Sequence, residues 1–95
     1  MATPVVRLFD INIAGGAVTG PGAPTVLTNG LPTSAIGDFV SAHAPCPIIP
    51  SHCAAVVAQG SPTVLVQGRP VAYVGAIDSC GHIRATGSPT VLVGI

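Results

Sequence analysis

The phrase Gly60-Ser-Pro-Thr-Val-Leu-Val-Gln-Gly68 decides the fold of this chain, because close copies of it occur three times. One copy precedes it as Gly22-Ala-Pro-Thr-Val-Leu-Thr-Asn-Gly30, and another follows it as Gly87-Ser-Pro-Thr-Val-Leu-Val-Gly94. An internal repeat defines the architecture before any local signal does. With 95 residues, the chain is therefore expected to form one small domain over residues 1–95, built from three similar β-units.

Each copy carries the signals of a β-hairpin. Residues 63–66 and 90–93 are short β-branched runs that follow Ser-Pro, and a strand tolerates proline at its entrance. Asn29-Gly30 and Gln67-Gly68 then provide turns, Asn-Gly being among the strongest hairpin signals. Because Gly or Pro interrupts every 3.6-residue period, the sequence predicts an all-β fold of three pseudo-repeated short hairpins with little or no helix.

The repeat extends past each turn into a returning strand, a second turn and an insert. Returning strands are expected over residues 33–36 and 71–74. They lead into Ile36-Gly37-Asp38 and Val74-Gly75-Ala76, to which Leu8-Phe9-Asp10 looks related. Inserts of unequal length, residues 11–21, 39–59 and 79–86, then join each unit to its Pro-Thr-Val-Leu strand.

Charged side chains are almost absent, with no Lys, no Glu and a net charge of zero. The six that occur are Arg7, Arg69, Arg84, Asp10, Asp38 and Asp78. A chain without a basic face lacks the means to bind nucleic acid or to dock electrostatically on a membrane surface. Its apolar residues are mostly Val, Ala, Ile and Leu, so we expect a thin core that needs a metal, a disulfide or a partner to stabilise it.

Targeting signals are missing from the sequence. No segment approaches the roughly 18 apolar residues of a membrane-spanning helix. Residues 1–7 lack the basic and then apolar pattern of a secretory signal peptide. If the protein leaves the cytoplasm, we expect a route other than general secretion to carry it.

All three histidines and all three cysteines lie in the second and third inserts. They are His43, Cys46, His52, Cys53, Cys80 and His82. Zinc prefers four nitrogen and sulfur ligands in a tetrahedron, so a structural metal site is favoured, although the spacing is not that of a zinc finger. A disulfide is disfavoured, because three cysteines cannot all pair and no export signal is visible. Ordinary buried thiols with surface histidines are the third interpretation.

Two local arrangements of these residues bear on the choice between a metal site and a catalytic site. His52 and Cys53 would point to opposite sides of an extended segment, so only one of them would face an ion. Asp78-x-Cys80-x-His82 contains the residue types of a nucleophile and its base, but alternate residues of a strand form a row instead of a cleft. With few polar groups to hold a substrate, catalysis is disfavoured; it would take the form of an open zinc site with a bound water.

Together these features resemble the PAAR-repeat family, the small cone-shaped tips of type VI secretion spikes and of related phage-tail-like injection machines. The resemblance rests on residues 60–75 with their two partial copies, on Ile36-Gly37-Asp38 followed by His43, and on Ser79-Cys80-Gly81-His82. The Pro-Ala-Ala-Arg motif that names the family is Pro70-Val71-Ala72-Tyr73 here, and Ala76 stands where the family has aspartate.

The resemblance implies a structural zinc ion near the apex of the cone, held by three histidines and one cysteine. His43, His52 and His82 are the available histidines. Cys80 is the chosen thiolate because it shares the third insert with His82. Cys46, three residues after His43, is the alternative thiolate, and Cys53 is expected to be a packing residue.

The resemblance also implies a mechanical role and no enzymatic one. Three hairpins would form a three-sided base that caps the blunt end of a trimeric β-helical spike protein, with one copy per trimer. The sharpened spike would pierce a membrane and deliver effectors. The implied partners are the spike, separate effector proteins and, transiently, the target membrane, without nucleic acid or a small-molecule substrate. The protein would be cytoplasmic before firing and injected without a signal peptide, and no fused effector domain is expected. A small zinc enzyme and a metal-free β-rich scaffold are the alternatives.

Overall fold

A computed structural model describes residues 2–43 and 54–94 of the chain. It contains eight short strands: β1 Ala2–Pro4, β2 Val18–Gly20, β3 Ala23–Thr28, β4 Leu31–Thr33, β5 Phe39–Val40, β6 Leu65–Val66, β7 Arg69–Pro70 and β8 Leu92–Gly94. They pair two by two, always antiparallel, as β1–β8, β2–β5, β3–β4 and β6–β7. No helix occurs in the described ranges, which confirms the predicted all-β class.

Two of the hairpins have the turns that the sequence predicts. In β3–β4 the turn residues Asn29 and Gly30 have φ angles of 54° and 81°, and in β6–β7 Gln67 and Gly68 have 49° and 80°. Two consecutive positive φ angles define a type I′ turn, whose twist matches that of the flanking strands. The local turn chemistry therefore fixes the register of both hairpins.

The returning segments are shorter as hairpin strands than expected. Residues 33–36 and 71–74 leave their hairpins and pair across units through Arg7↔Thr33, Ala35↔Val71 and Val5↔Tyr73. One segment from each unit thus contacts the segments of the other two. The hairpins shorten because these residues hold the three units together around a common axis.

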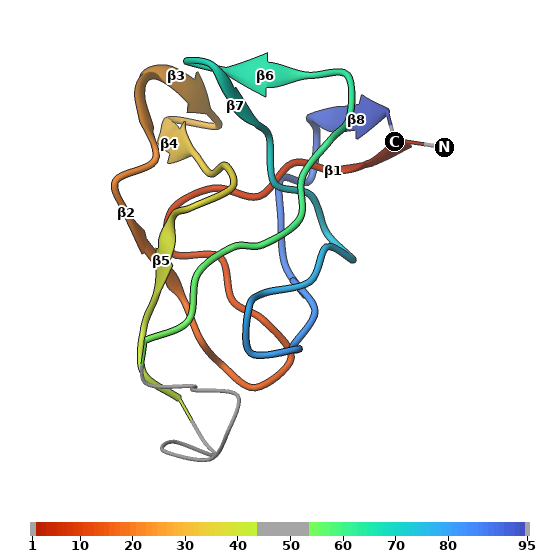
Figure 1. The fold of residues 1–95 in the computed structure, drawn as a ribbon. Helices are drawn as coiled ribbons and strands as arrows, with labels where there is room; N and C mark the ends of the chain where they lie inside the picture. The colour runs from red at the N-terminus through yellow and green to blue at the C-terminus, as the bar shows by residue number, and fades with distance from the viewer. Residues whose placement is uncertain (1, 44–53, 95) are drawn as a thin grey trace.

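The third hairpin is formed by the two ends of the chain. Strand β8 pairs with β1 through Ala2↔Gly94, Thr3↔Val93 and Pro4↔Leu92. The two termini consequently lie side by side among the hairpins at the upper end of the molecule (Figure 1). The three-unit pattern is therefore completed by residues that are almost the full chain length apart.

A tight turn follows each returning segment at residues 7–10, 35–38 and 73–76. In all three turns the amide of the fourth residue donates to the carbonyl of the first over 3.1 Å. The third residue is left-handed, with φ of 76° at Phe9, 93° at Gly37 and 99° at Gly75. A type II turn requires this conformation and glycine adopts it freely, whereas a phenylalanine there costs about 1 kcal/mol or more.

Aspartate completes two of these turns. Asp10 accepts the Arg7 amide at 2.8 Å, and Asp38 accepts the Ala35 amide at 3.0 Å. Ala76 occupies the corresponding place in the third turn, which is closed by the hydrogen bond from the Ala76 amide to the Tyr73 carbonyl without a carboxylate. The departure from the family pattern at this position therefore removes the carboxylate contact and leaves the turn intact.

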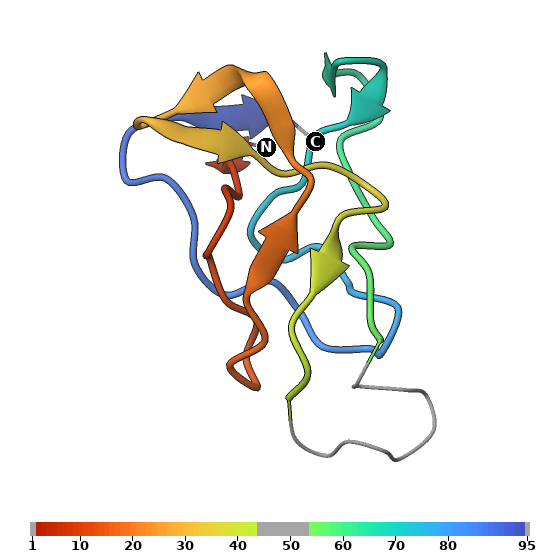
Figure 2. The ribbon, with the colours of Figure 1, turned by 90° about the vertical axis from the view of Figure 1, so that its left-hand side faces the viewer.

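Below the hairpins, six backbone segments close into a ring, which we call the ring hereafter. Neighbouring segments within the ring are joined through the residue pairs Asn12↔Arg84, Ile77↔Ile83, Val57↔Asp78, Phe39↔Val56, Val18↔Val40 and Ile11↔Ala17. The last pair returns to the first segment, so the ring has no free edge. Figure 2 shows β2 and β5 running side by side as part of this region, below the hairpins.

Side chains alternate between the inside and the outside of the ring, as the period of two in extended backbone requires. The buried positions are Asn12, Val18, Val40, Val57, Asp78 and Arg84. Their neighbours Ile11, Ile13, Phe39, Ile77 and Ile83 are exposed. Each segment therefore fills the ring with one side chain and presents the next to the surroundings.

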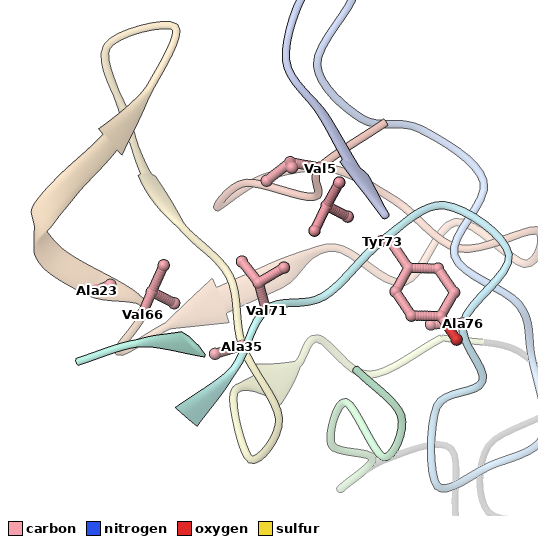
Figure 3. Close-up of a cluster of buried hydrophobic side chains, with 8 residues drawn as sticks. Val5, Ala23, Ala35, Val66, Val71, Tyr73 and Ala76 are labelled. Carbon is pink, nitrogen blue, oxygen red and sulfur yellow. The ribbon is translucent and has the colours of Figure 1, made fainter. Parts of the chain in front are cut away.

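Small residues make the core. One cluster beneath the hairpins contains Val5, Ala23, Ala35, Val66, Val71, Tyr73, Ala76 and Val93, most of them drawn in Figure 3. A second cluster, closer to the ring, contains Val6, Val18, Val40, Ala55, Val57, Ala72 and Cys80. Both phenylalanines of the chain remain outside, with Phe9 66% and Phe39 60% exposed. The largest apolar side chains thus face outward while valine and alanine pack inside.

All six charged side chains form ion pairs with each other. Arg7 contacts Asp10 at 2.9 Å, Arg69 contacts Asp38 at 2.7 Å, and Arg84 contacts Asp78 at 2.8 Å. Burial opposes ionisation of Asp10, but hydrogen bonds from Arg7 and Thr86 outweigh it and lower the pKa of Asp10 below its ordinary value of 3.8. A carboxyl group with a lowered folded-state pKa stabilises the fold at neutral pH, and that contribution is lost as the pH falls through the lowered value.

We expect Asp38→Ala to destabilise the protein by about 3 kcal/mol in urea unfolding and Asp10→Ala to cost less. Asp38 is completely buried and accepts hydrogen bonds from Ala35, Ser34, Gly22 and Arg69, all of which lose a partner. The Asp10 site is closer to solvent, so its donors are rehydrated more easily. Equal losses in the two variants would contradict the role assigned to the buried carboxylate.

Candidate metal centre

Three potential metal ligands lie at the end of the molecule opposite the hairpins. His43 follows β5, and Cys80 and His82 belong to a tight turn between the paired residues Ile77 and Ile83. In that turn Gly81 has a φ of 92°, its amide donates to the Asp78 carbonyl, and the Asp78 amide donates to the His82 carbonyl. The left-handed glycine thus reverses the chain and places Cys80 and His82 on either side of it.

The three side chains converge on one point. His43 Nε2 lies 3.1 Å from His82 Nδ1, and the Cys80 sulfur lies 3.5 Å from His43 Nε2 and 3.6 Å from His82 Nδ1. His43 and Cys80 are buried, and His82 is half-buried. Residues from two inserts therefore present two imidazole nitrogens and one sulfur to the same small volume, close enough to bind a metal ion.

These distances fit tetrahedral coordination. For zinc bonds of about 2.0–2.1 Å to nitrogen and about 2.3 Å to sulfur, a tetrahedron separates two nitrogens by about 3.3 Å and a nitrogen from a sulfur by about 3.5 Å. The separations of 3.1, 3.5 and 3.6 Å agree with those values to within about 0.2 Å. The donor set and its spacing thus suit one ion bound by all three groups.

A backbone carbonyl orients the first of these ligands. His43 Nδ1 lies 2.7 Å from the Ser41 carbonyl oxygen, which can only accept a hydrogen bond. In a neutral imidazole the proton is therefore on Nδ1, and the lone pair of Nε2 points to the other two ligands. Metal-binding histidines generally donate their second ring nitrogen in this way. Gly16 lies against the same ring, because a Cβ there would be only 2.5 Å from His43 Nδ1.

A buried polar network supports the turn that carries the other two ligands. Asp78 accepts hydrogen bonds from Asn12 at 2.9 Å and from Arg84 at 2.8 Å inside the ring. Arg84 also donates to the Gly16 and Asp10 carbonyls, at 2.8 and 3.2 Å. Burial lowers the pKa of Arg84, while Asp78 and Cys80 oppose that shift. Both ends of the Cys80–His82 turn are thereby fixed to the first unit.

This supporting network could not be predicted from the sequence. The only signal available was the position of Asp78, two residues beyond the place where the repeat has Ala76. Its partner Asn12 is 66 residues away, and no local pattern relates the two. Asp78 is held by Arg84 inside the ring, whereas Cys80 and His82 lie in a tight turn and converge with His43, so these three residues do not form the row of a strand that was expected.

Three of the four proposed ligands, His43, Cys80 and His82, are brought together by the described residues. The fourth, His52, lies outside the described residues, as do Cys46 and Cys53. The choice of His52 as a ligand and the expectation that Cys53 is a packing residue therefore stay predictions. Cys80 lies beside both histidines, and its choice over Cys46 stays a prediction as well, because Cys46 is outside the described residues.

The chain belongs to the PAAR motif family, whose pattern matches residues 10–83 and 49–94. Proteins of this family are structural spike-tip modules of the type VI secretion kind, and that coarse role holds for this chain. No curated protein matches the sequence significantly. Within the described ranges, no helix has the length and apolar character needed to cross a membrane.

We expect His82→Ala to lower both the bound metal and the melting temperature, because it removes one ligand of a site whose binding energy adds to folding. Cys53→Ala is the matched control and should change neither quantity. Elemental analysis of the purified variants and thermal unfolding with and without a chelator measure both effects. Loss of metal from the Cys53 variant but not from the His82 variant would show that the ligands are wrongly assigned.

Proposed function

We propose that the protein is the tip of a contractile injection spike, which caps the blunt end of a trimeric β-helical spike protein and is closed at its apex by a structural zinc ion. The ligands would be His43, Cys80 and His82, with His52 as the fourth. The spike would carry the tip through a membrane together with effector proteins. Family membership supports this role, and two surfaces of the molecule supply its physical basis.

The hairpin end carries a threefold-repeated apolar surface, which we call the base. Its side chains are Val26, Leu27, Val64, Leu65, Val91 and Leu92, one Val-Leu pair from each repeat. The leucines are 59%, 59% and 58% exposed, and the valines 37%, 39% and 40%. This near-identity is the observation that carries the proposal, because a trimeric partner presents three equal patches and the base offers three equal counterparts.

The centre of the base is hollow. A depression of about 350 Å³ lies among the hairpins and is lined mainly by aliphatic side chains, including Val26, Leu27, Val64, Val91 and Leu92. An apolar protrusion on the axis of a trimer would fill this depression and remove further apolar surface from water. One copy of the tip suits one trimer, because its three repeats already provide all three contacts.

Zinc is the ion that suits the site formed by His43, Cys80 and His82. Two imidazole nitrogens and one thiolate at tetrahedral spacing match its preference for nitrogen and sulfur donors, and a fourth protein ligand would make the site closed and structural. When bound, the ion would join the second insert to the third and add its binding energy to folding. This chain's own contribution is to hold the three donors in place through Ser41, Gly81 and the Asp78–Arg84 pair.

We expect Leu65→Ser to weaken binding to the spike protein roughly tenfold and the triple variant at Leu27, Leu65 and Leu92 to abolish it, because each leucine would be buried on docking. The probe is a purified trimeric β-helical spike protein from the same genome as this chain, with binding and one-to-three stoichiometry measured by native mass spectrometry. Ile13→Ser, at a side chain equally exposed but outside the base, is the control. A tip that binds normally with all three leucines replaced would refute docking through the base.

A further inference from the structure

We propose that the turn formed by residues 12–16, in the one insert without histidine or cysteine, positions His43 for metal binding. We call it the ligand-free turn, and we call the turn of residues 78–82 the ligand turn. Gly16 is the positioning residue, because its missing side chain makes room for the His43 ring. The inference rests on the proposed closure of the apex by a metal ion, and it assigns a role to an insert that supplies no donor atom.

The two turns have the same backbone structure. In the ligand-free turn the Asn12 amide donates to the Gly16 carbonyl over 2.9 Å, and the Gly15 amide donates to the Asn12 carbonyl over 3.0 Å. The corresponding two bonds of the ligand turn are both 2.9 Å long. The φ angle is 88° at Gly15 and 92° at Gly81. Both turns lie near the end of the molecule opposite the hairpins, orange and blue in Figure 1.

This equivalence shows which residues stand in place of the ligands. Counted from the shared left-handed glycine, Ala14 occupies the position of Cys80, and Gly16 occupies the position of His82. The same register continues into the flanking pairs Ile11↔Ala17 and Ile77↔Ile83. The first unit thus keeps the backbone of a ligand turn and lacks both of its donor groups.

The room left at Gly16 is taken up by the metal ligand of the second insert. A Cβ at residue 16 would lie 2.5 Å from His43 Nδ1, 2.8 Å from Val40 Cγ1 and 2.9 Å from Asn12 Nδ2. These distances are well inside van der Waals contact, so a side chain there would displace the ring. Gly16 does not have a left-handed φ, so its backbone would accept alanine. The neighbouring side chains, with the His43 ring closest, are what require glycine.

Ala17, directly after the ligand-free turn, holds the segment that carries His43. The Ser41 amide donates to the Ala17 carbonyl at 2.8 Å, and the Ala17 amide donates to the Ser41 hydroxyl at 2.9 Å. The Ser41 carbonyl in turn accepts the hydrogen bond from His43 Nδ1. The ring is therefore fixed by its bond to Ser41 and by its contact with Gly16, and both depend on the first insert.

Asn12 links the ligand-free turn to the ligand turn. Its side-chain oxygen accepts hydrogen bonds from the amides of Ala14 and Gly16, at 2.9 and 2.8 Å. Its side-chain nitrogen donates to Asp78 Oδ2 at 2.9 Å, and the residue is only 1% exposed. The ligand-free turn thus contacts both segments that carry ligands, and it sets the separation between His43 and the ligand turn.

The test compares alanine substitutions at two adjacent glycines of the full-length protein. Gly16→Ala should weaken zinc binding roughly tenfold or more, measured by competition with a chelator, because it displaces a ligand. Gly15→Ala is the matched control. Nothing lies within 4 Å of a Cβ there, but the φ of 88° strains any residue with a side chain. This control should lower the melting temperature of the metal-free protein and leave the zinc affinity unchanged.

Cobalt(II) bound in place of zinc reports the geometry of the site through its visible spectrum. Gly16→Ala should lose intensity in the bands of tetrahedral, thiolate-bound cobalt, and Gly15→Ala should keep them. Should Gly16→Ala fail to fold, Ser41→Ala provides a second test, because it adds no atoms and removes the hydroxyl that accepts the Ala17 amide. It should lower the zinc affinity severalfold, and an unchanged affinity would count against the inference.

A measurement without metal separates this inference from the proposed function. In long-range ¹H–¹⁵N NMR spectra of the metal-free protein, the His43 ring signals should shift in Gly16→Ala and stay in place in Gly15→Ala. A wild type that binds neither zinc nor cobalt would refute the metal closure and this inference with it. A wild type that binds zinc, with an unmoved His43 signal and normal affinity in Gly16→Ala, would refute the role of Gly16 alone. An equal loss of affinity in Gly15→Ala would reduce that role to general stability and also overturn the inference.

Discussion

The structure depends on the antiparallel pairing of three units around one axis, which closes both the hairpin layer and the ring. No unit is large enough to bury its own apolar side chains. The cross-unit pairs Arg7↔Thr33, Ala35↔Val71 and Val5↔Tyr73 bring the three units together. The β1–β8 pair completes the circle with the two ends of the chain. This closure brings the second and third inserts together, so that His43 meets Cys80 and His82.

Closure also decides which side chains face outward. A ring this narrow has room for small residues and for one polar network, so valines, Asn12, Asp78 and Arg84 fill it. The larger isoleucines and both phenylalanines are left outside, where a soluble monomer would not ordinarily place them. The outcome is a molecule with an apolar base, exposed isoleucines and phenylalanines around the ring, and internally paired charges. Each of these features suits a small protein that functions while bound to a larger partner.

The sequence predicted what local chemistry controls. Asn29-Gly30 and Gln67-Gly68 determine the hairpin turns without help from distant residues, and the clustering of His and Cys in two inserts indicated where a site would form. The exposed Val-Leu pairs of the base also follow from the repeat. The match to the PAAR motif family confirmed the family resemblance that these features had indicated.

The remaining features depend on contacts between distant segments. Apart from the short β2–β5 pair, the ring is made of isolated single-residue pairings, which are too short to show periodicity in the sequence. The Asn12–Asp78 hydrogen bond links residues 66 positions apart. Phe9 adopts the same left-handed conformation as Gly37 and Gly75, but its residue type does not signal that conformation in the sequence. In each case the repeat showed which positions are equivalent. The contacts in the folded chain then showed how those equivalent positions differ in structure.

Zinc-edge X-ray absorption of the purified full-length protein tests most directly whether imidazoles and a thiolate from separate inserts bind one ion. The account predicts about one zinc per chain, with nitrogen ligands at about 2.0–2.1 Å and a single sulfur at about 2.3 Å that disappears in Cys80→Ser. A protein that holds no zinc, or a zinc shell of light atoms without sulfur in the wild type, would contradict it.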